Sequence, residues 1–187
     1  YDLGVDMLSA SAHKFNGPKG VGFLYIRSGL KVMPYSDGGA QEFGLRAGTE
    51  NVAGIVGMAV ALKNNCDALE ENTRYVEGLA SELVGMLNSS GVKYAMNGGT
   101  NRLPGLLSLS FPEFDGEAIL HRLDLAGICI STGSACNSKS TEISHVLQAI
   151  QLGDKYAKGT IRISLGKDNI EDDVEAIFKA LMKIFRV

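Results

Sequence analysis

The chain has 187 residues, of which 45% are hydrophobic and 21% are charged, and its formal net charge at pH 7 is -3. These proportions indicate a folded globular protein and exclude a disordered chain. Lysine and arginine form no cluster, so neither nucleic acid nor an anionic membrane is an expected partner. No apolar run approaches the roughly 20 residues of a membrane helix and no signal peptide opens the chain, so we expect a cytoplasmic protein.

Glycine and cysteine usage adds two constraints. Glycine accounts for 23 of the 187 residues and gathers around Lys14, Arg46 and Cys136, which indicates turns where a backbone approaches a ligand closely. The three cysteines are odd in number and lack metal-site spacing, so we expect neither a disulfide framework nor a bound metal. One of the thiols is then a candidate for chemistry.

Hydrophobic periodicity and turn residues predict a mixture of strands and helices in chain order. The elements expected are strands over 5–12, 20–27, 92–96, 106–111, 128–131 and 160–165, an irregular loop over 37–51, two successive helices within 50–90, the second from Leu69 to near 89–91, and helices over 115–125, 143–150 and 170–185. Thr49 is the expected N-cap of the first helix. The helical stretch 50–90 is expected to connect two domains.

Lys14 lies at the end of the first expected strand, just before a glycine-proline turn. Ser11 and His13 provide a hydroxyl and an imidazole group beside it, and the alanines between them leave room for a bulky group. A lysine can lose its proton through desolvation in such surroundings and form a Schiff base with an aldehyde. The alternative is an ordinary solvated lysine, which is the more common case.

The loop over 37–51 is glycine-rich and polar and leads directly into a helix. Backbone N–H groups and the positive end of the helix dipole would meet there, which suits a phosphate group. A plain loop followed by a capped helix explains the same pattern equally well.

Cys136 lies in the polar stretch 131–141, where no neighbour could bury it. An exposed thiol invites oxidation, so a working thiol in a swinging loop is the favoured interpretation, with an incidental cysteine as the alternative. Cys129 precedes the loop within an apolar strand, where we expect it to be buried. Cys66 is interpreted as a small structural residue.

Arg162 stands between two isoleucines in the strand over 160–165. It is either an outward-facing charge on a half-exposed strand or a bidentate clamp for a carboxylate, to which the planar guanidinium is well suited. His121 is expected to be an ordinary surface histidine. His145, close to the cysteine loop, has a slightly better claim to chemistry.

Several short segments, taken together in their chain order, indicate a protein family. They are SAHK (11–14) with GPKG (17–20), GG (38–39) with QE (41–42), RAGTEN (46–51), STGSAC (131–136) and IRISLG (161–166). This combination resembles the cysteine desulfurases of the class V aminotransferase family, which use pyridoxal phosphate. The RAGTEN segment and the long cysteine loop look like the housekeeping group that supplies sulfur for iron-sulfur clusters.

The resemblance implies a role for each matching residue. Lys14 would hold pyridoxal phosphate as a Schiff base and move the substrate Cα proton, and Ser11 and His13 would bind the cofactor phosphate. Thr49 would reach the phosphate held by the other subunit of a homodimer. Arg162 would hold the carboxylate of the substrate, L-cysteine.

The same resemblance implies the sulfur chemistry and the fold. Cys136 as a thiolate would take the substrate sulfur as a persulfide with release of alanine, and a sulfur-acceptor or scaffold protein would then receive it. The implied fold class is α/β plus α+β, the C-terminal part of a fold-type I pyridoxal-phosphate-dependent transferase. Residues 1–70 would be the C-terminal part of the cofactor-binding large domain and residues 71–187 the small C-terminal domain.

The chain also departs from the family pattern. Phe43 stands where the family usually carries arginine and Ala40 where it often carries a third glycine, so an altered dimer-side loop is expected. Relatives carry, before the lysine, roughly as many residues again, including a histidine that stacks on the cofactor ring and an aspartate that pairs with its pyridinium nitrogen. Asp2 and Asp6 are too close to Lys14 to replace that aspartate.

We therefore expect the C-terminal half of such an enzyme, with little or no desulfurase activity by itself. One alternative is a non-catalytic remnant that acts at most as a dimerisation or binding module. Another is a different class V enzyme, such as a selenocysteine lyase.

Overall fold

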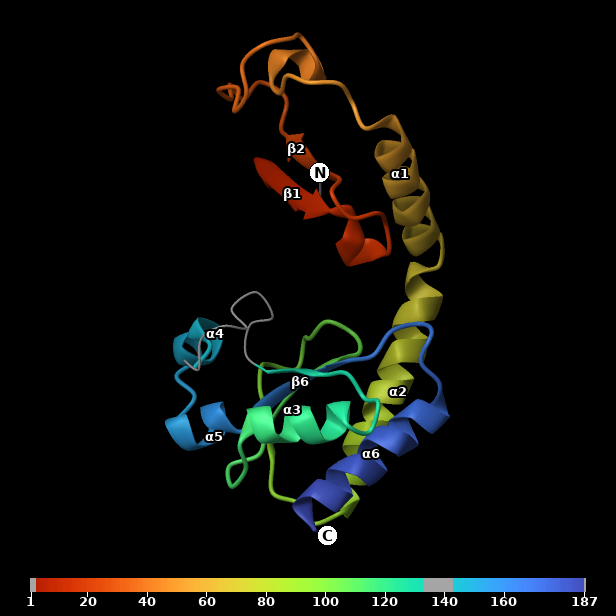
Figure 1. The fold of residues 1–187 in the computed structure, drawn as a ribbon, viewed down its shortest axis with the longest axis vertical. Helices are drawn as coiled ribbons and strands as arrows, with labels where there is room; N and C mark the ends of the chain where they lie inside the picture. The colour runs from red at the N-terminus through yellow and green to blue at the C-terminus, as the bar shows by residue number, and fades with distance from the viewer. Residues whose placement is uncertain (1–2, 133–142, 187) are drawn as a thin grey trace. The chain divides into compact units, whose positions relative to one another are not determined.

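The computed structural model describes residues 3–132 and 143–186 of the chain (Figure 1). The chain divides into two compact units, Tyr1–Leu69 and Glu70–Val187. Within the described residues, none of the helices combines the length and the apolar character that crossing a membrane requires.

The first unit is built on an antiparallel hairpin. Strand β1 (Met7–Ser11) pairs with β2 (Gly22–Ile26) over their full length. The short 3-10 helix η1 (Ala12–Phe15) follows β1 directly, and a second one, η2 (Glu42–Gly44), interrupts the glycine-rich loop. Helix α1 (Val52–Asp67) ends the unit and lies against η1.

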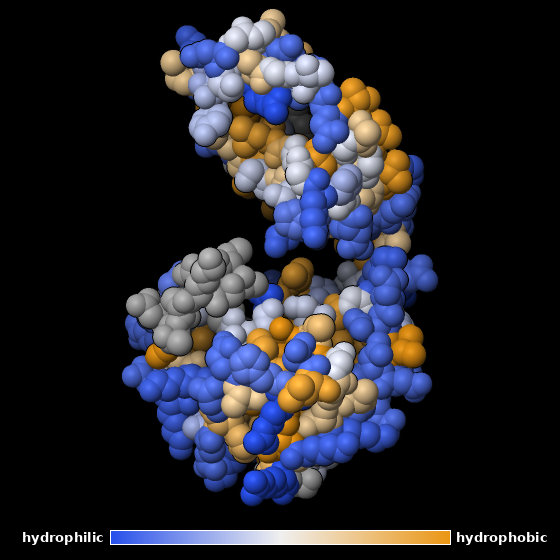
Figure 2. Space-filling model, in the orientation of Figure 1, coloured by the Kyte–Doolittle hydropathy of each residue, from blue (hydrophilic) through white to orange (hydrophobic). Residues whose placement is uncertain are grey.

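The first unit has almost no hydrophobic core of its own. Ala12 is its one buried hydrophobic residue among those described, whereas larger apolar side chains on both strands and along α1 stay exposed. They include Met7, Leu8, Leu24, Tyr25, Val52, Ile55, Val56 and Val60. Figure 2 shows hydrophobic residues on the outside of α1. A sheet with apolar side chains on both faces is typical of the interior of an α/β domain, so we expect a further layer of protein to cover it.

The second unit is a four-stranded antiparallel sheet with helices. Its elements are α2 (Leu69–Ser89), β3 (Ala95–Met96), β4 (Leu106–Ser110), α3 (Gly116–Asp124), β5 (Ser131–Thr132), α4 (His145–Ala149), α5 (Asp154–Lys158), β6 (Thr160–Ser164) and α6 (Glu171–Phe185). The strand order is β3-β4-β6-β5, so β6 lies between β4 and β5.

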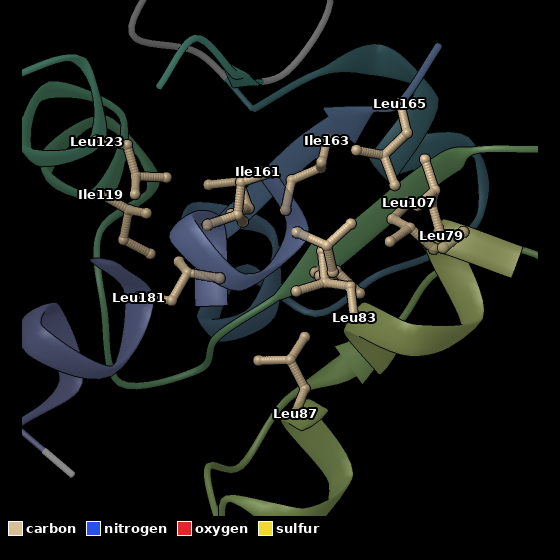
Figure 3. Packing of buried hydrophobic residues seen from close by; sticks show 14 of the residues in the cluster. Leu79, Leu83, Leu87, Leu107, Ile119, Leu123, Ile161, Ile163, Leu165 and Leu181 are labelled. Atoms are coloured by element: carbon tan, nitrogen blue, oxygen red, sulfur yellow. The ribbon is translucent and has the colours of Figure 1, made fainter. Parts of the chain in front are cut away.

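The core of the second unit lies between this sheet and helices α2, α3 and α6. In β6, the side chains of Ile161 and Ile163 are buried and pair across the sheet with Leu109 and Leu107 of β4. Leucines of α2 pack onto these strands from the helix side, as Figure 3 shows for Leu79, Leu83 and Leu87. Because side chains alternate along a strand, Arg162 lies on the opposite face of the sheet from this core.

Helix α6 begins with an acidic first turn that stabilises its N-terminus. The Asp173 carboxylate accepts hydrogen bonds from the Asn169 side chain at 3.0 Å and from the Ile170 backbone N–H at 3.1 Å. These two bonds favour the charged form, so they hold the pKa of Asp173 below its ordinary value. The folded state therefore gains stability from Asp173 at neutral pH and loses it as the pH falls through this lowered pKa.

Most elements predicted from the sequence are confirmed, but the start of α1 is not where it was expected. Thr49 is not the N-cap, because α1 begins at Val52 and the Asn51 side chain accepts the hydrogen bond from Gly54 N at 3.1 Å. Threonine and asparagine are both good capping residues, and hydrophobic periodicity does not locate a helix start to within two residues.

Two further expectations in the second unit are wrong. The strand predicted over 128–131 is reduced to β5, and Cys129 is exposed, not buried. Helix α5 was not predicted, because its five residues are too few to show a hydrophobic period. In the first unit, Cys66 on α1, interpreted as a small structural residue, is also exposed. His121 is exposed on α3, as expected of a surface histidine.

We predict that Leu83→Ala lowers the free energy of unfolding of the second unit by about 2–5 kcal/mol, because the side chain is fully buried and its loss leaves a cavity. Urea denaturation followed by circular dichroism measures this change. Leu125→Ala is the matched control, since that leucine is 88% exposed and its truncation should be nearly neutral. Equal effects of the two substitutions would contradict the assigned core.

Candidate active site

Lys14 lies in η1, the single turn of 3-10 helix that follows β1. Ser11, the last residue of β1, occupies the N-cap position of η1, but its side chain makes no capping hydrogen bond. His13 and Lys14 are both exposed in this chain. Among the described residues, Lys14 forms none of the salt bridges, so its amine is not committed to a carboxylate.

Backbone hydrogen bonds close the turn around Lys14. The N–H of Ala12 donates to Val21 O at 3.0 Å, and its carbonyl accepts from Gly17 N at 2.8 Å. A Cβ atom at position 17 would lie 2.8 Å from the Ala12 Cβ, so only glycine fits there. We call residues 12–17 the lysine turn; its shape is set by main-chain contacts with no room for a side chain at Gly17.

Helix α1 lies far from the lysine turn in the sequence but contacts it in the structure. The Asn65 side chain donates hydrogen bonds to Phe15 O at 2.9 Å and to Ala61 O of its own helix at 2.8 Å. At Gly57 the helix approaches Pro18 so closely that a Cβ would lie 3.0 Å from the proline ring. The position of Lys14 therefore depends on α1 as well as on β1.

Thr49 lies in the same unit, in the exposed segment that leads into α1. Two internal hydrogen bonds stabilise the loop before Thr49. Gly48 N donates to the Gln41 side chain at 3.2 Å, and the Arg46 side chain donates to Gly48 O at 3.2 Å. Phe43 adopts a left-handed backbone conformation, with φ 59°, and its side chain is fully exposed. A bulky residue in that conformation is uncommon and often marks a functional segment.

Arg162 belongs to the second unit and lies on the polar face of its sheet. It is paired in register with Ser108 of β4 and with Ser131 of β5. Its Nη2 donates to the Ser131 hydroxyl at 3.3 Å, while its Nε is buried without a hydrogen-bond partner in the described part of the chain. A buried donor without a partner costs about 1–3 kcal/mol, so this guanidinium is suited to an anionic ligand.

The structure thus places His13 and Lys14 on the lysine turn with Ser11 directly before it, Thr49 in the same unit and Arg162 in the other. Cys136 lies outside the described residues. Sequence reasoning missed Asn65, which has no motif of its own, and it included Ser131 in the STGSAC segment without giving it a role beside Arg162. Only the contacts across the fold identify what these two residues do.

Comparison with known proteins identifies the family of this chain. The family model described as "Aminotransferase class-V" matches residues 1–177, and the chain belongs to this family. Within it, the chain is 45% identical over 184 residues to the cysteine desulfurase IscS of Dictyoglomus turgidum, a match that covers 98% of this chain and 47% of the relative. The cysteine desulfurase IscS of Clostridium botulinum is 42% identical over 188 residues and covers 99% of this chain.

Solved structures give the same result. A NifS-like protein matches with a TM-score of 0.88 at 41% identity, over 98% of this chain and 47% of its own. A NifS-like protein from Rickettsia africae matches with a TM-score of 0.88 at 33% identity, over 99% of this chain and 49% of its own. The family resemblance and the fold class expected from the sequence are confirmed. The chain spans about half the length of the curated relatives it matches.

We predict that Asn65→Ala loosens the lysine turn, because Phe15 O loses its hydrogen bond to α1. Amide hydrogen exchange over residues 12–17 should accelerate several-fold. Asn64→Ala is the control, since this neighbouring side chain is exposed and its loss should leave exchange in the turn unchanged. Equal exchange in both variants would show that Asn65 does not hold the turn.

Proposed function

We propose that this chain is part of a pyridoxal-phosphate-dependent cysteine desulfurase, which converts L-cysteine to L-alanine and transfers the sulfur to Cys136. The observation that carries the proposal is Lys14 on a turn closed by main-chain hydrogen bonds, flanked by Ser11 and His13, in a class V chain that is 42–45% identical to cysteine desulfurases. Sulfur supply for iron-sulfur clusters is the process we expect it to serve.

The residues of the lysine turn, together with Ser11 directly before it, fit the cofactor. Lys14 offers a primary amine without a salt-bridge partner among the described residues, and an aldehyde is the group that such an amine binds covalently. The Ser11 hydroxyl, free of a capping role, and the His13 imidazole are suited to phosphate oxygens. When bound, pyridoxal phosphate supplies an electron sink for the substrate carbon atoms.

Each residue then has a definite task. Arg162 binds the carboxylate of L-cysteine through its guanidinium, whose Nε lacks a partner in the described part of the chain. Lys14 removes the proton from the substrate Cα and returns a proton as alanine forms. The Asp6 carboxylate pairs with Arg27, so we do not assign it to the cofactor nitrogen.

Cys136 provides the nucleophile for the sulfur. Its thiolate attacks the sulfur of the substrate, so that the carbon–sulfur bond breaks and a sulfur–sulfur bond forms. The electron pair of the broken bond stays with the carbon, which is protonated to give alanine, while the enzyme thiol becomes a persulfide. The substrate carbon is reduced and sulfur is oxidised within one reaction, so no external oxidant or reductant is required.

We infer that residues 1–70 form the C-terminal part of a cofactor-binding large domain and residues 71–187 the small domain. The two compact units and the exposed apolar surface of the first support this division. We further infer a homodimer in which Thr49 reaches the cofactor phosphate of the other subunit, and a sulfur-acceptor or scaffold protein that receives the persulfide in the cytoplasm. The fully exposed Phe43 ring supports contact between its loop and another protein surface.

A non-catalytic binding module is the second candidate, because the first unit buries so little apolar surface. Cofactor loading separates the two functions. We predict that pyridoxal phosphate added to the chain forms a coloured adduct on Lys14, and that borohydride bleaches and fixes it there.

Peptide mapping of the reduced protein locates the label. Lys14→Ala should abolish it, and Lys19→Ala should not, because Lys19 lies outside η1 in the following turn. Label spread equally over both lysines, or a protein that stays colourless, would favour the binding module.

We expect the chain by itself to release little or no alanine from cysteine, since Lys14 is exposed and its unit lacks a core. The sulfur step is therefore tested in a chimera in which the unmatched half of the Dictyoglomus turgidum relative precedes this chain. We predict that Cys136→Ala in this chimera reduces persulfide formation below detection while cofactor absorbance is retained. Cys129→Ala, which removes an exposed thiol earlier in the chain, is the control and should retain the persulfide. Unchanged sulfide release by Cys136→Ala would refute the desulfurase role.

A further inference from the structure

The polar face of the four-stranded sheet holds Arg162 between two serines. Ser108 of β4 and Ser131 of β5 are both paired in register with Arg162, so one hydroxyl group flanks it on each side. The two serines nevertheless differ in what they bind. Only Ser131 accepts a hydrogen bond from the guanidinium, through Nη2 at 3.3 Å.

Ser108 is engaged elsewhere. Its hydroxyl oxygen accepts a hydrogen bond from the Asn97 side chain at 3.1 Å, and the same amide donates to Ser110 at 2.8 Å. Ser110 is fully buried and shares a 2.7 Å hydrogen bond with Thr160. These bonds form a polar network along β4 that does not include Arg162, so the serine on that side does not orient the guanidinium.

Ser131 is itself held in place. Strand β5 has only two residues, and both are paired with β6. The side chain of the second, Thr132, is hydrogen-bonded to Glu117 on α3, which fixes the strand against that helix. The Ser131 hydroxyl therefore approaches Arg162 from a segment anchored on two sides.

We propose that Ser131 is a positioning residue for Arg162: it holds one N–H group of the guanidinium and thereby orients the rest of the planar fork. The role of that fork in binding the substrate carboxylate rests on the proposed function. A planar guanidinium has five N–H donors in fixed geometry, so one bond at Nη2 limits the directions of the other four. Orienting it before the ligand arrives reduces the entropy lost on binding.

The test uses the full chain, labelled with ¹⁵N, and follows the Arg162 Nε–H signal, assigned by its loss in Arg162→Lys. In Ser131→Ala we expect faster motion and faster hydrogen exchange at Nε, and a roughly tenfold weaker affinity for L-alanine, an unreactive amino acid with the same carboxylate. Ser131→Thr keeps the hydroxyl and should restore both values. Ser108→Ala is the matched control and should change neither by more than about twofold.

The outcomes distinguish the positioning role of Ser131 from the carboxylate-binding role of Arg162. Unchanged Nε motion in Ser131→Ala, or an equal loss in Ser108→Ala, would overturn the positioning role. If Ser131→Ala releases the guanidinium while the unsubstituted chain binds no L-alanine, the positioning role is supported and the carboxylate role of Arg162 fails. Faster motion at the Arg162 Nε together with weaker binding of L-alanine supports both the positioning role of Ser131 and the carboxylate role of Arg162.

Discussion

The antiparallel pairing of β6 with β4 and β5 is the constraint on which the second unit depends. One register places Ile161 and Ile163 in the core against α2, α3 and α6, and it places Arg162 on the opposite face beside Ser131. A slip by one residue would exchange these faces. It would then bury an unpaired guanidinium and expose two isoleucines, at a cost of several kcal/mol. Core packing and the orientation of the candidate carboxylate-binding residue are therefore determined by the same strand.

The first unit is stabilised in a different way. Main-chain hydrogen bonds close the lysine turn, and Asn65 connects it to α1, while the surrounding apolar side chains remain exposed. The relatives extend well beyond the matched region, so a covering layer is consistent with their length. Such a layer would remove water from around Lys14, which would favour the further chemistry at this lysine. Hydrogen bonds within this chain thus set the geometry of the lysine turn, whereas a covering layer would provide the environment that makes Lys14 reactive.

Much of this could be predicted from the residues alone. The lysine between small polar neighbours, the glycine-rich loop, the arginine strand and most of the helices and strands carry local signals of period or composition. The errors occur where two local signals compete or where no signal exists. Thr49 and Asn51 are both capping residues, and the structure uses the second. Cys129 lies in an apolar run that predicts a buried strand, yet that run precedes a strand of only two residues and leaves the thiol exposed.

The sequence by itself determined the family, the fold class and the residue types available for chemistry, because these depend on local pattern and on the order of short motifs. The tertiary structure decided which polar groups meet. Asn65 reaches Phe15 across 50 positions of the chain, and Ser131 reaches Arg162 across 31. Such pairs depend on how helices and strands pack, and the core as a whole determines that packing. No local sequence pattern therefore predicts them.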